Sequence, residues 1–182
     1  EEVAENEYVL NPSRYLQRET VVKNGVFFET VIKNITRGAQ IKASVLDEIV
    51  SDEPTNMQYL MLANLQDGII SDELPYLKGI DSKYEKYCIK NGSLVISKNA
   101  SPVKMAIVSV QEGNKILANG NLYVIELDKD KINPYFLKAY LESESGKAAL
   151  SRVAVGATLL NLPVEGLKKV IIPLPDLESQ KK

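Results

Sequence analysis

Three short segments of the sequence contain residues that could support catalysis or metal binding. Asn133-Pro134-Tyr135-Phe136 combines an asparagine with aromatic side chains and could hold an amino group for methyl transfer. Asp176, Glu178 and Lys181 follow a proline pair and could support metal-dependent cleavage of a phosphodiester bond. Asp128-Lys129-Asp130-Lys131 places carboxylates at alternate positions, as a calcium-binding loop does. Each segment has to be weighed against a purely structural role.

A structural role explains all three segments more simply. The first resembles the Asn-Pro-Pro-Tyr/Phe motif of amino-methyltransferases, but the second proline and an upstream glycine-rich cofactor loop are missing. It predicts a helix with Asn133 as N-cap and Pro134 at the first position. Asp176 is expected to cap a helix over residues 177–182. Residues 128–131 lack the glycine and terminal glutamate of a calcium loop and predict a solvated turn. We therefore expect no catalytic constellation, no metal site and no cofactor.

The composition narrows the class of protein further. The chain has 182 residues, 45% hydrophobic and 25% charged, which suits one well-buried core. It has no histidine, which excludes Ser-His-Asp and Cys-His catalysis and zinc sites with histidine ligands. Cys88 is the single cysteine, so an internal disulfide is impossible and an intracellular setting is expected. No apolar run is long enough to span a membrane, and no secretory signal opens the chain. We expect a cytoplasmic domain that binds rather than reacts.

The pattern of apolar and turn residues predicts short strands mixed with short helices. This arrangement indicates an α+β fold, a single domain with a curved mixed or antiparallel sheet flanked by short helices. The expected domain covers residues 25–175, residues 1–24 form an ordered connector or a frayed tail, and residues 176–182 begin a truncated C-terminal spacer helix. The sequence starts at Glu1 and stops inside that predicted helix, so we expect a fragment of a larger protein. Strands are expected at 33–36, 59–65, 93–97, 103–110, 121–127 and 170–172, helices at 43–50, 134–141 and 144–153, and a short helix or turn at 26–32.

Charge is distributed unevenly along the chain. The formal net charge is −2, which argues against a general nucleic-acid coating protein. Residues 1–60 carry 6 basic and 10 acidic residues, whereas residues 61–182 carry 16 basic and 14 acidic residues. Residues 83–104 contain five lysines and one glutamate. Such a stretch could attract phosphates, or it could simply solvate an exposed face.

Three loops combine flexible backbone with donor side chains. Residues 96–104 join two apolar strands through lysine, serine and asparagine, which suit phosphate oxygens and adenine edges. In residues 36–38 and 156–161, a glycine allows close approach of the backbone and a donor lies nearby. The alternative for each loop is an ordinary polar connection.

Several segments in order resemble one known family. They are Ile35-Thr36-Arg37-Gly38, residues 59–65 with Asp67-Gly68, residues 92–97, residues 132–137 and residues 156–162, followed by the ending at residues 171–180. Together they resemble a target recognition domain of the specificity subunit of type I restriction–modification systems, and the resemblance covers most of residues 26–182. Residues 7–15 are similar to the tail of the modification (methyltransferase) subunit of the same systems.

The resemblance implies sequence-specific recognition of double-stranded DNA in the major groove. Catalysis would then come from partners, namely methyltransferase (modification) subunits and a restriction or translocase subunit, with no role for a membrane. The parent would be an N6-adenine DNA methyltransferase, fused to or continuing into this domain. An ordinary specificity subunit carries two such domains and one is visible here, so the target could be bipartite, palindromic through dimerisation, or a half-site. The residues expected to face DNA are Arg37, Lys98, Asn99, Ser101, Lys104, Thr158 and Asn161.

A protein-interaction domain is the alternative function. It would dock a partner through the apolar helix at residues 133–141 and the C-terminal helix. The two functions differ in one observable property, because docking requires that the apolar faces of these helices are not already buried inside the domain.

Overall fold

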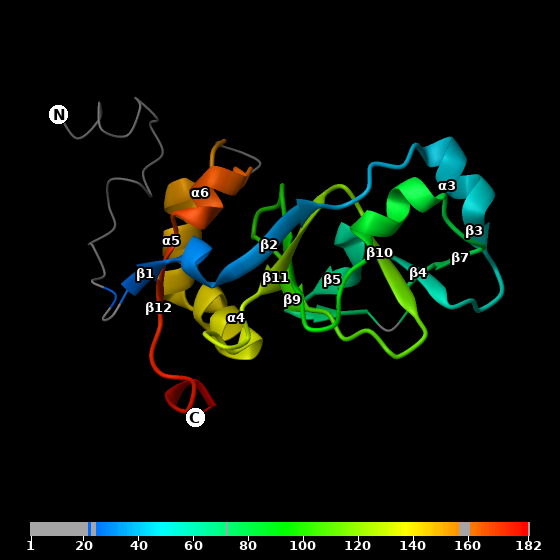
Figure 1. The fold of residues 1–182 in the computed structure, drawn as a ribbon. Helices are drawn as coiled ribbons and strands as arrows, with labels where there is room; N and C mark the ends of the chain where they lie inside the picture. The colour runs from blue at the N-terminus through cyan, green and yellow to red at the C-terminus, as the bar shows by residue number, and fades with distance from the viewer. Residues whose placement is uncertain (1–21, 23–24, 72, 157–160, 182) are drawn as a thin grey trace.

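A computed structural model of the chain describes residue 22 and residues 25–71, 73–156 and 161–181 (Figure 1). The predicted α+β class is confirmed, and the β-structure is divided among several small sheets. The connector predicted at residues 1–24 lies outside the described residues except for Val22. The strands are β1 (Gly25–Phe27), β2 (Ile32–Arg37), β3 (Val50–Ser51), β4 (Met57–Leu60), β5 (Leu65–Gln66), β6 (Ile69–Ile70), β7 (Tyr76–Leu77), β8 (Leu94–Ser97), β9 (Met105–Ile107), β10 (Lys115–Ala118), β11 (Leu122–Leu127) and β12 (Ile171–Pro173). The helices are α3 (Ala43–Ile49), α4 (Pro134–Glu142), α5 (Glu144–Val153) and α6 (Val164–Lys168), with 3₁₀ turns η1 (Phe28–Val31), η2 (Leu62–Asn64), η3 (Ser82–Tyr87) and η4 (Ser179–Lys181).

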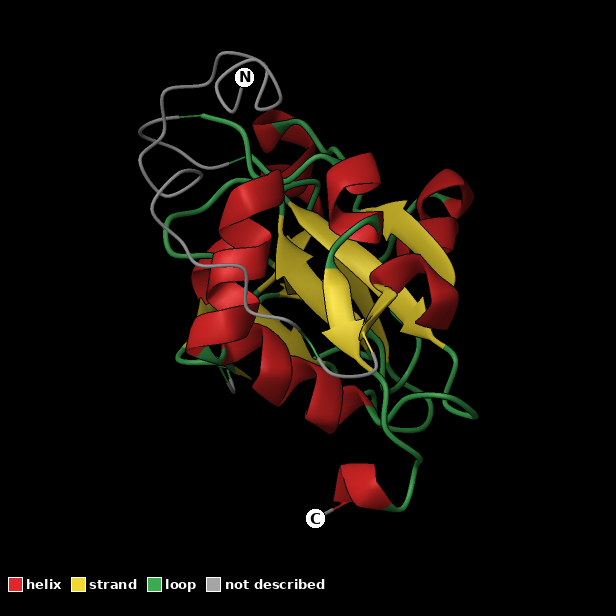
Figure 2. Cartoon of the chain, turned by 90° about the vertical axis from the view of Figure 1, so that its left-hand side faces the viewer, coloured by secondary structure: helices red, strands yellow, loops and turns green. Residues whose placement is uncertain are grey.

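The centre of the fold is an antiparallel sheet in the order β2-β11-β8-β9. Both of its faces are covered, because alternate residues of β11 enter different apolar clusters. Tyr123 and Ile125 pack into the cluster that contains α4 and α5, whereas Leu122 and Val124 pack into a second cluster on the opposite face. Figure 2 shows helices flanking the strands on both sides of the view. The middle of the sheet is thus buried on both faces.

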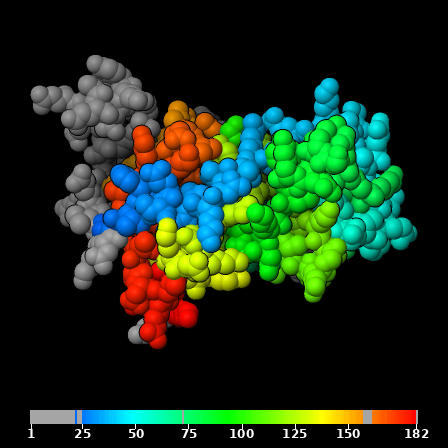
Figure 3. All heavy atoms as spheres, viewed as in Figure 1, coloured from blue at the N-terminus to red at the C-terminus, as the bar shows by residue number. Residues whose placement is uncertain are grey.

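A second four-stranded sheet lies beside the first and makes the molecule elongated. Its order is β10-β4-β7-β3, and the β10–β4 pair is parallel, so this sheet is mixed. The green and cyan segments of this sheet occupy one end of the molecule in Figure 3, and the yellow, orange and blue segments around α4, α6 and β1 occupy the other. The remaining strands form the two-stranded sheets β1–β12 and β5–β6.

The structure corrects the strand predicted at residues 59–65. Strand β4 ends at Leu60, and the chain then forms the turn η2, where the Asn64 side-chain oxygen accepts a hydrogen bond from the Met61 N–H at 3.0 Å. Asp67 and Gly68, with φ of 48° and 77°, then form the turn of the β5–β6 hairpin. Of residues 26–32, predicted as a short helix or turn, residues 28–31 form the turn η1, residues 26–27 belong to β1 and Ile32 begins β2.

The helix predictions at 43–50, 134–141 and 144–153 are confirmed as α3, α4 and α5. Leu137 and Leu141 of α4 are buried in the core, so this helix already uses its apolar face inside the domain. The helix predicted from residue 177 is a 3₁₀ turn at Ser179–Lys181 in the described residues. In the described part of the chain, no helix is long and apolar enough to cross a bilayer.

Candidate nucleic-acid interface

One end of the central sheet gathers most of the residues predicted to face DNA. Because the sheet is antiparallel, two strands end and two strands begin at the same edge of it. These are the end of β2 at Arg37, the end of β8 at Ser97, the start of β9 at Met105 and the start of β11 at Leu122. Figure 1 shows the end of β2 in the upper middle of the view, above the labels of β11 and β9. We call this region the sheet end. It consists of residues 36–42, 97–105, 118–122, 155–156 and 161–162, and residues 157–160 are outside the described residues.

The loop between β8 and β9 is closed by hydrogen bonds at its base. The Ser97 N–H donates to the Lys104 carbonyl at 2.8 Å, and the Lys104 N–H donates to the Ser97 hydroxyl at 2.9 Å. Ser97 is fully buried, whereas Lys98 and Lys104 are partly exposed and Ser101 is exposed. Among the described residues, neither lysine takes part in an ion pair. Their charges are therefore available to an external anion.

Asn161 is brought to this loop by backbone pairing. The Leu162 N–H donates to the Lys98 carbonyl at 2.9 Å, and Asn161 forms bridges with both Asn99 and Val155. The Asn161 side-chain oxygen is buried and accepts no hydrogen bond from the described residues. Backbone pairing therefore joins residues 98–99 to residues 161–162, which are more than 50 residues apart in the sequence. Thr158 falls within residues 157–160, which are outside the described residues.

Arg37 is exposed, but one of its donors is already used. Its Nε–H donates to the Gly120 carbonyl at 2.7 Å, which connects β2 to the turn between β10 and β11. The neighbouring Gly38 N–H donates to the Leu122 carbonyl at 3.0 Å. A Cβ at Gly38 would overlap the Asn119 carbonyl and lie 2.6 Å from the Ala118 oxygen. The close approach expected at this glycine is thus to the chain's own backbone.

The lysines at residues 83–104 are not one surface in space. Lys83 pairs with Asp81 at 2.9 Å, and Lys86 lies over the Tyr87 ring, both on or beside η3. Lys90 precedes β8, at the opposite end of the sheet, and pairs with Glu126 at 2.7 Å. This ion pair lowers the pKa of Glu126 below its usual range. Of the five lysines, the sheet end contains Lys98 and Lys104.

The basic residues of the sheet end are more consistent in charge than the lysines at residues 83–104, but in the sequence they are divided among separate segments. The sheet end contains four basic residues and no acidic residue. No contiguous stretch carries that signal, because the segments come from three connections of the central sheet and from the loop after α5. They are adjacent through strand pairing rather than through sequence. The four basic residues are Arg37, Lys42, Lys98 and Lys104.

The three segments that could have supported catalysis or metal binding have local structural roles. The Asn133 side-chain oxygen accepts hydrogen bonds from the N–H groups of Tyr135 and Phe136, at 2.9 and 3.5 Å, as a helix cap. Asp176 accepts hydrogen bonds from the Ser179 N–H and hydroxyl. Asp128 pairs with Lys33 at 3.1 Å, and the bond to this lysine is the main cause of its lowered pKa. Within the described residues, no group of side chains could hold a metal ion.

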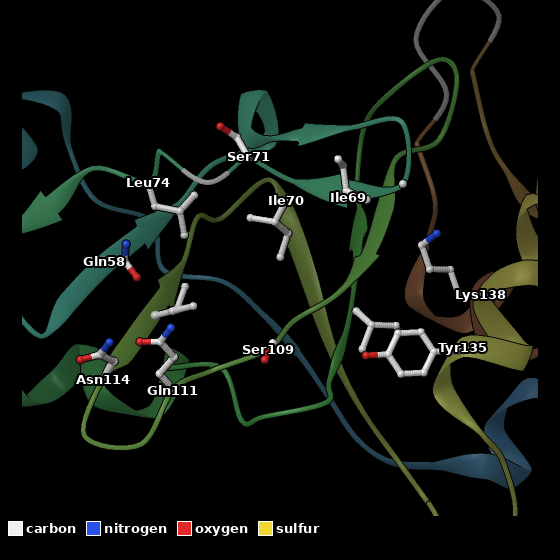
Figure 4. A pocket seen from close by; sticks show the side chains of 13 residues that line it. Gln58, Ile69, Ile70, Ser71, Leu74, Ser109, Gln111, Asn114, Tyr135 and Lys138 are labelled. Atoms are coloured by element: carbon white, nitrogen blue, oxygen red, sulfur yellow. The ribbon is translucent and has the colours of Figure 1, made fainter.

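A cleft among the described residues lies away from the sheet end and was not predicted. It has a volume of about 550 Å³ and runs from the β5–β6 hairpin past the end of β9 to α4 (Figure 4). Figure 4 shows the amides of Gln58, Gln111 and Asn114 on one side, with Tyr135 and Lys138 on the other. Two exposed apolar side chains, Ile69 and Tyr135, stand at its rim, each 67% exposed. The lining residues come from four separate segments, so sequence spacing alone contained no signal for it.

Comparison with known proteins identifies a family and a fold. The model of the family described as type I restriction modification DNA specificity domain matches residues 34–182. A search of curated proteins found no match. A solved structure described in terms of complex assembly and conformational transition of the type I R-M system aligns with a TM-score of 0.61 and 18% identity, covering 99% of this chain and 40% of that one.

Two further solved structures show the same likeness. The HsdS subunit from Thermoanaerobacter tengcongensis aligns with a TM-score of 0.57 and 15% identity over 98% of this chain and 41% of that one. The type I restriction-modification system S subunit from M. genitalium aligns with a TM-score of 0.53 and 14% identity over 91% of this chain and 38% of that one. The present chain therefore spans about 40% of the solved chains that it matches. Since the family model covers most of the sequence, the chain belongs to the family of type I restriction modification DNA specificity domains.

Proposed function

We propose that this chain is a sequence-specific DNA recognition module that directs type I restriction–modification methylation and restriction to their target site. The observation that carries the proposal is the sheet end, where strand pairing assembles four basic residues without any acidic one. A positive surface with amide and hydroxyl side chains suits a duplex, because phosphates are bound by charge and base edges by hydrogen bonds.

In this proposal the residues have two kinds of role. Lys98, Lys104 and Ser101 bind phosphate oxygens. Asn99 offers its carboxamide to a base edge, and Asn161, whose side-chain oxygen is buried, offers its amide nitrogen. Thr158, which lies outside the described residues, is proposed to share this surface. Arg37 keeps its terminal guanidinium nitrogens for DNA while its Nε–H is bound to Gly120.

The parent assembly is proposed to be an N6-adenine DNA methyltransferase acting in the cytoplasm, with modification subunits and a restriction or translocase subunit as partners. Residues 25–175 would be the recognition domain, residues 1–24 a connector, and residues 176–182 the start of a spacer helix. The family membership supports a module without catalytic residues of its own.

The test compares two double variants with the same charge change in the intact protein and its assembly. Lys98→Ala/Lys104→Ala removes two sheet-end charges, and Lys83→Ala/Lys86→Ala removes two charges at η3. Binding of duplex DNA is measured at several salt concentrations. We expect the first pair to reduce the slope of log K against log salt by about 1.8, roughly 0.9 for each lost phosphate contact. The η3 pair should leave the slope unchanged. Equal effects of the two double variants would contradict the proposal.

Contact with a partner protein is the second candidate function, and the cleft is the observation that favours it. The apolar face of α4 is buried, so docking through that face has no support. The exposed Ile69 and Tyr135 at the cleft remain. If the cleft binds a partner subunit, Ile69→Ser/Tyr135→Ser should weaken assembly while DNA binding by the chain itself stays unchanged.

A further inference from the structure

Most described asparagine and glutamine side chains stabilise the fold, and those that do not are clustered. The carboxamides of Asn64, Asn91, Asn133 and Gln180 all bind backbone groups. Among the described residues, the carboxamides without a hydrogen bond fall into two groups. One group is at the cleft, and the other is at the sheet end. The cleft group is Gln58, Gln111 and Asn114, and the sheet-end group is Gln40, Asn99, Asn121 and Asn161.

A chain of two hydrogen bonds connects the backbone of Asn121 to the protein core. Tyr59 is buried and its hydroxyl accepts a hydrogen bond from the Asn119 Nδ2 at 2.6 Å. The side-chain oxygen of Asn119 then accepts a hydrogen bond from the Asn121 N–H at 2.9 Å. This chain of two bonds fixes the turn between β10 and β11 to a residue that water barely reaches.

The same turn is also held from both sides. The Arg37 Nε–H binds the Gly120 carbonyl at 2.7 Å, and the Lys98 N–H binds the Asn121 carbonyl at 2.8 Å. The turn therefore lies between β2 and the β8–β9 loop, at the centre of the sheet end. The backbone N–H and carbonyl of Asn121 are both hydrogen-bonded, whereas its side chain is exposed and unbound among the described residues.

We propose that Asn121 contacts a base edge of the bound DNA and that Arg37 is a positioning residue that holds its turn. This inference rests on the proposed function. A carboxamide presents one donor and one acceptor side by side, which matches N6 and N7 of adenine in the major groove. Because the turn is already ordered, little conformational entropy is lost when it enters the groove. A neutral amide adds little to phosphate attraction, so its contribution falls on selectivity.

Arg37 could act as a positive charge at a phosphate or as a residue that holds the Asn121 turn, and a lysine substitution distinguishes these two roles. If Arg37 served only as a positive charge at a phosphate, lysine would replace it with little loss. If its Nε–H holds the Asn121 turn, lysine would keep the charge but lose the planar, directed donor. Arg37→Lys should then affect the same base pair as Asn121→Ala.

The experiment uses the intact protein in its assembly with modification subunits, after the target has been mapped from methylated positions in cells. Binding is measured for the target duplex, for every single-base-pair variant of it, and for a non-target duplex of equal length. The variants are Asn121→Ala, Arg37→Lys and the double variant, with Gln111→Ala as the matched control. Gln111 is also an exposed, unbound amide, but it lies at the cleft.

We expect Asn121→Ala to reduce discrimination at one base pair by roughly 5- to 150-fold, the range of one bidentate contact, without changing affinity for the non-target duplex. Arg37→Lys should reduce discrimination at that same base pair, and the double variant should be no worse than Asn121→Ala alone. Gln111→Ala should behave as the unmodified protein.

Unaltered discrimination in Asn121→Ala, with a protein that still selects its target, would overturn the inference and leave the proposed function intact. An additive double variant, or a uniform loss of affinity in Arg37→Lys, would overturn the positioning role of Arg37. If the unmodified protein showed no preference for any mapped sequence, the proposed function itself would fail. Melting curves of Asn121→Ala provide the folding check, and we expect no change because its side chain holds nothing in the fold.

Discussion

Replacement of Gln180 by alanine should destabilise the domain far more than its position near the end of the sequence suggests. The side chain is 6% exposed and binds three backbone groups. Its oxygen accepts from the Asn133 N–H at 2.7 Å, and its nitrogen donates to the Lys131 carbonyl at 3.0 Å and the Pro175 carbonyl at 2.7 Å. One amide thus connects the C-terminal turn η4 to the start of α4.

The magnitude follows from counting those bonds. A typical intramolecular hydrogen bond contributes about 1 kcal/mol net, so three contribute roughly 3 kcal/mol. Water entering the space left by Gln180→Ala would satisfy part of the exposed groups, which lowers the expected loss to about 2–3 kcal/mol. With a urea m-value of about 2 kcal/mol/M, the midpoint of unfolding should fall by about 1–1.5 M.

Urea unfolding of the chain measures this loss, and Gln66→Ala is the matched control. Gln66 is an exposed glutamine with one 3.4 Å hydrogen bond to the Ala63 carbonyl, so its removal should change stability by less than about 0.5 kcal/mol. Equal midpoints for the two variants would refute the reasoning.

A charged variant tests whether hydrogen bonding rather than packing is responsible. In Gln180→Glu, an ionised carboxylate would face the Lys131 and Pro175 carbonyls with no proton to donate. Burial would raise the pKa of the introduced carboxyl, and its protonated form would be favoured in the folded state. Stability should therefore fall as the pH rises above the unfolded value of about 4.3. A pH-independent difference from the unmodified protein between pH 4 and 7 would show that packing, not bonding, dominates.

Three further predictions use the same unfolding measurement. Gly38→Ala should lose about 1–3 kcal/mol because the new Cβ meets backbone that cannot move aside, whereas Gly79→Ala, with nothing within 4 Å, should lose far less. Leu141→Ala should lose about 2–5 kcal/mol as a buried core leucine, and Tyr135→Ala should lose little because that ring is exposed; similar losses would contradict the assignment of the α4 faces. The ionised Asp128 carboxylate has a lowered pKa in the folded state, so it stabilises the fold above the pKa of the unfolded carboxyl, and this stabilisation is lost as the pH falls through the folded pKa. Asp128→Asn should therefore unfold at a lower urea concentration than the unmodified protein at pH 7. In acid the two unfolding curves should converge.

Local signals in the sequence were sufficient for most helices and for several strands. Asn133 and Pro134 mark the start of α4 because capping depends on neighbours within one turn of helix. The alternation in β11 is equally local. The strand predicted at 59–65 was wrong after Leu60, since the bond between Asn64 and Met61 favours a turn over continued extension. The pattern of apolar residues gives no information on this side-chain hydrogen bond, so it could not predict where the strand ends.

The sequence analysis grouped candidate-site residues correctly in space only where they lie on one loop. The lysines and the asparagine of the β8–β9 loop are adjacent in sequence, so their shared position was foreseeable. The sequence analysis did not single out Asn121 and Gln40, because they reach the sheet end through the pairing of β11 with β2 and β8. The register of that pairing is fixed only when the sheet assembles, so it cannot be read from either strand alone. The role assigned to Gly38 also depended on a neighbour, the backbone at Asn119, that is 81 residues away.

The placement of ion pairs explains how an acidic chain can present a surface suited to DNA. Away from the sheet end, lysines such as Lys83, Lys90 and Lys168 lie within 3 Å of a carboxylate, and each such pair is nearly neutral beyond a Debye length of about 8 Å. At the sheet end, Lys98 and Lys104 have no such partner among the described residues. The local field is therefore positive although the net charge is −2. Four basic residues can neutralise only about four phosphates, which corresponds to a salt slope near −3.6. A module with so few phosphate contacts would bind any duplex only weakly by itself and would depend on its assembly for the remaining affinity.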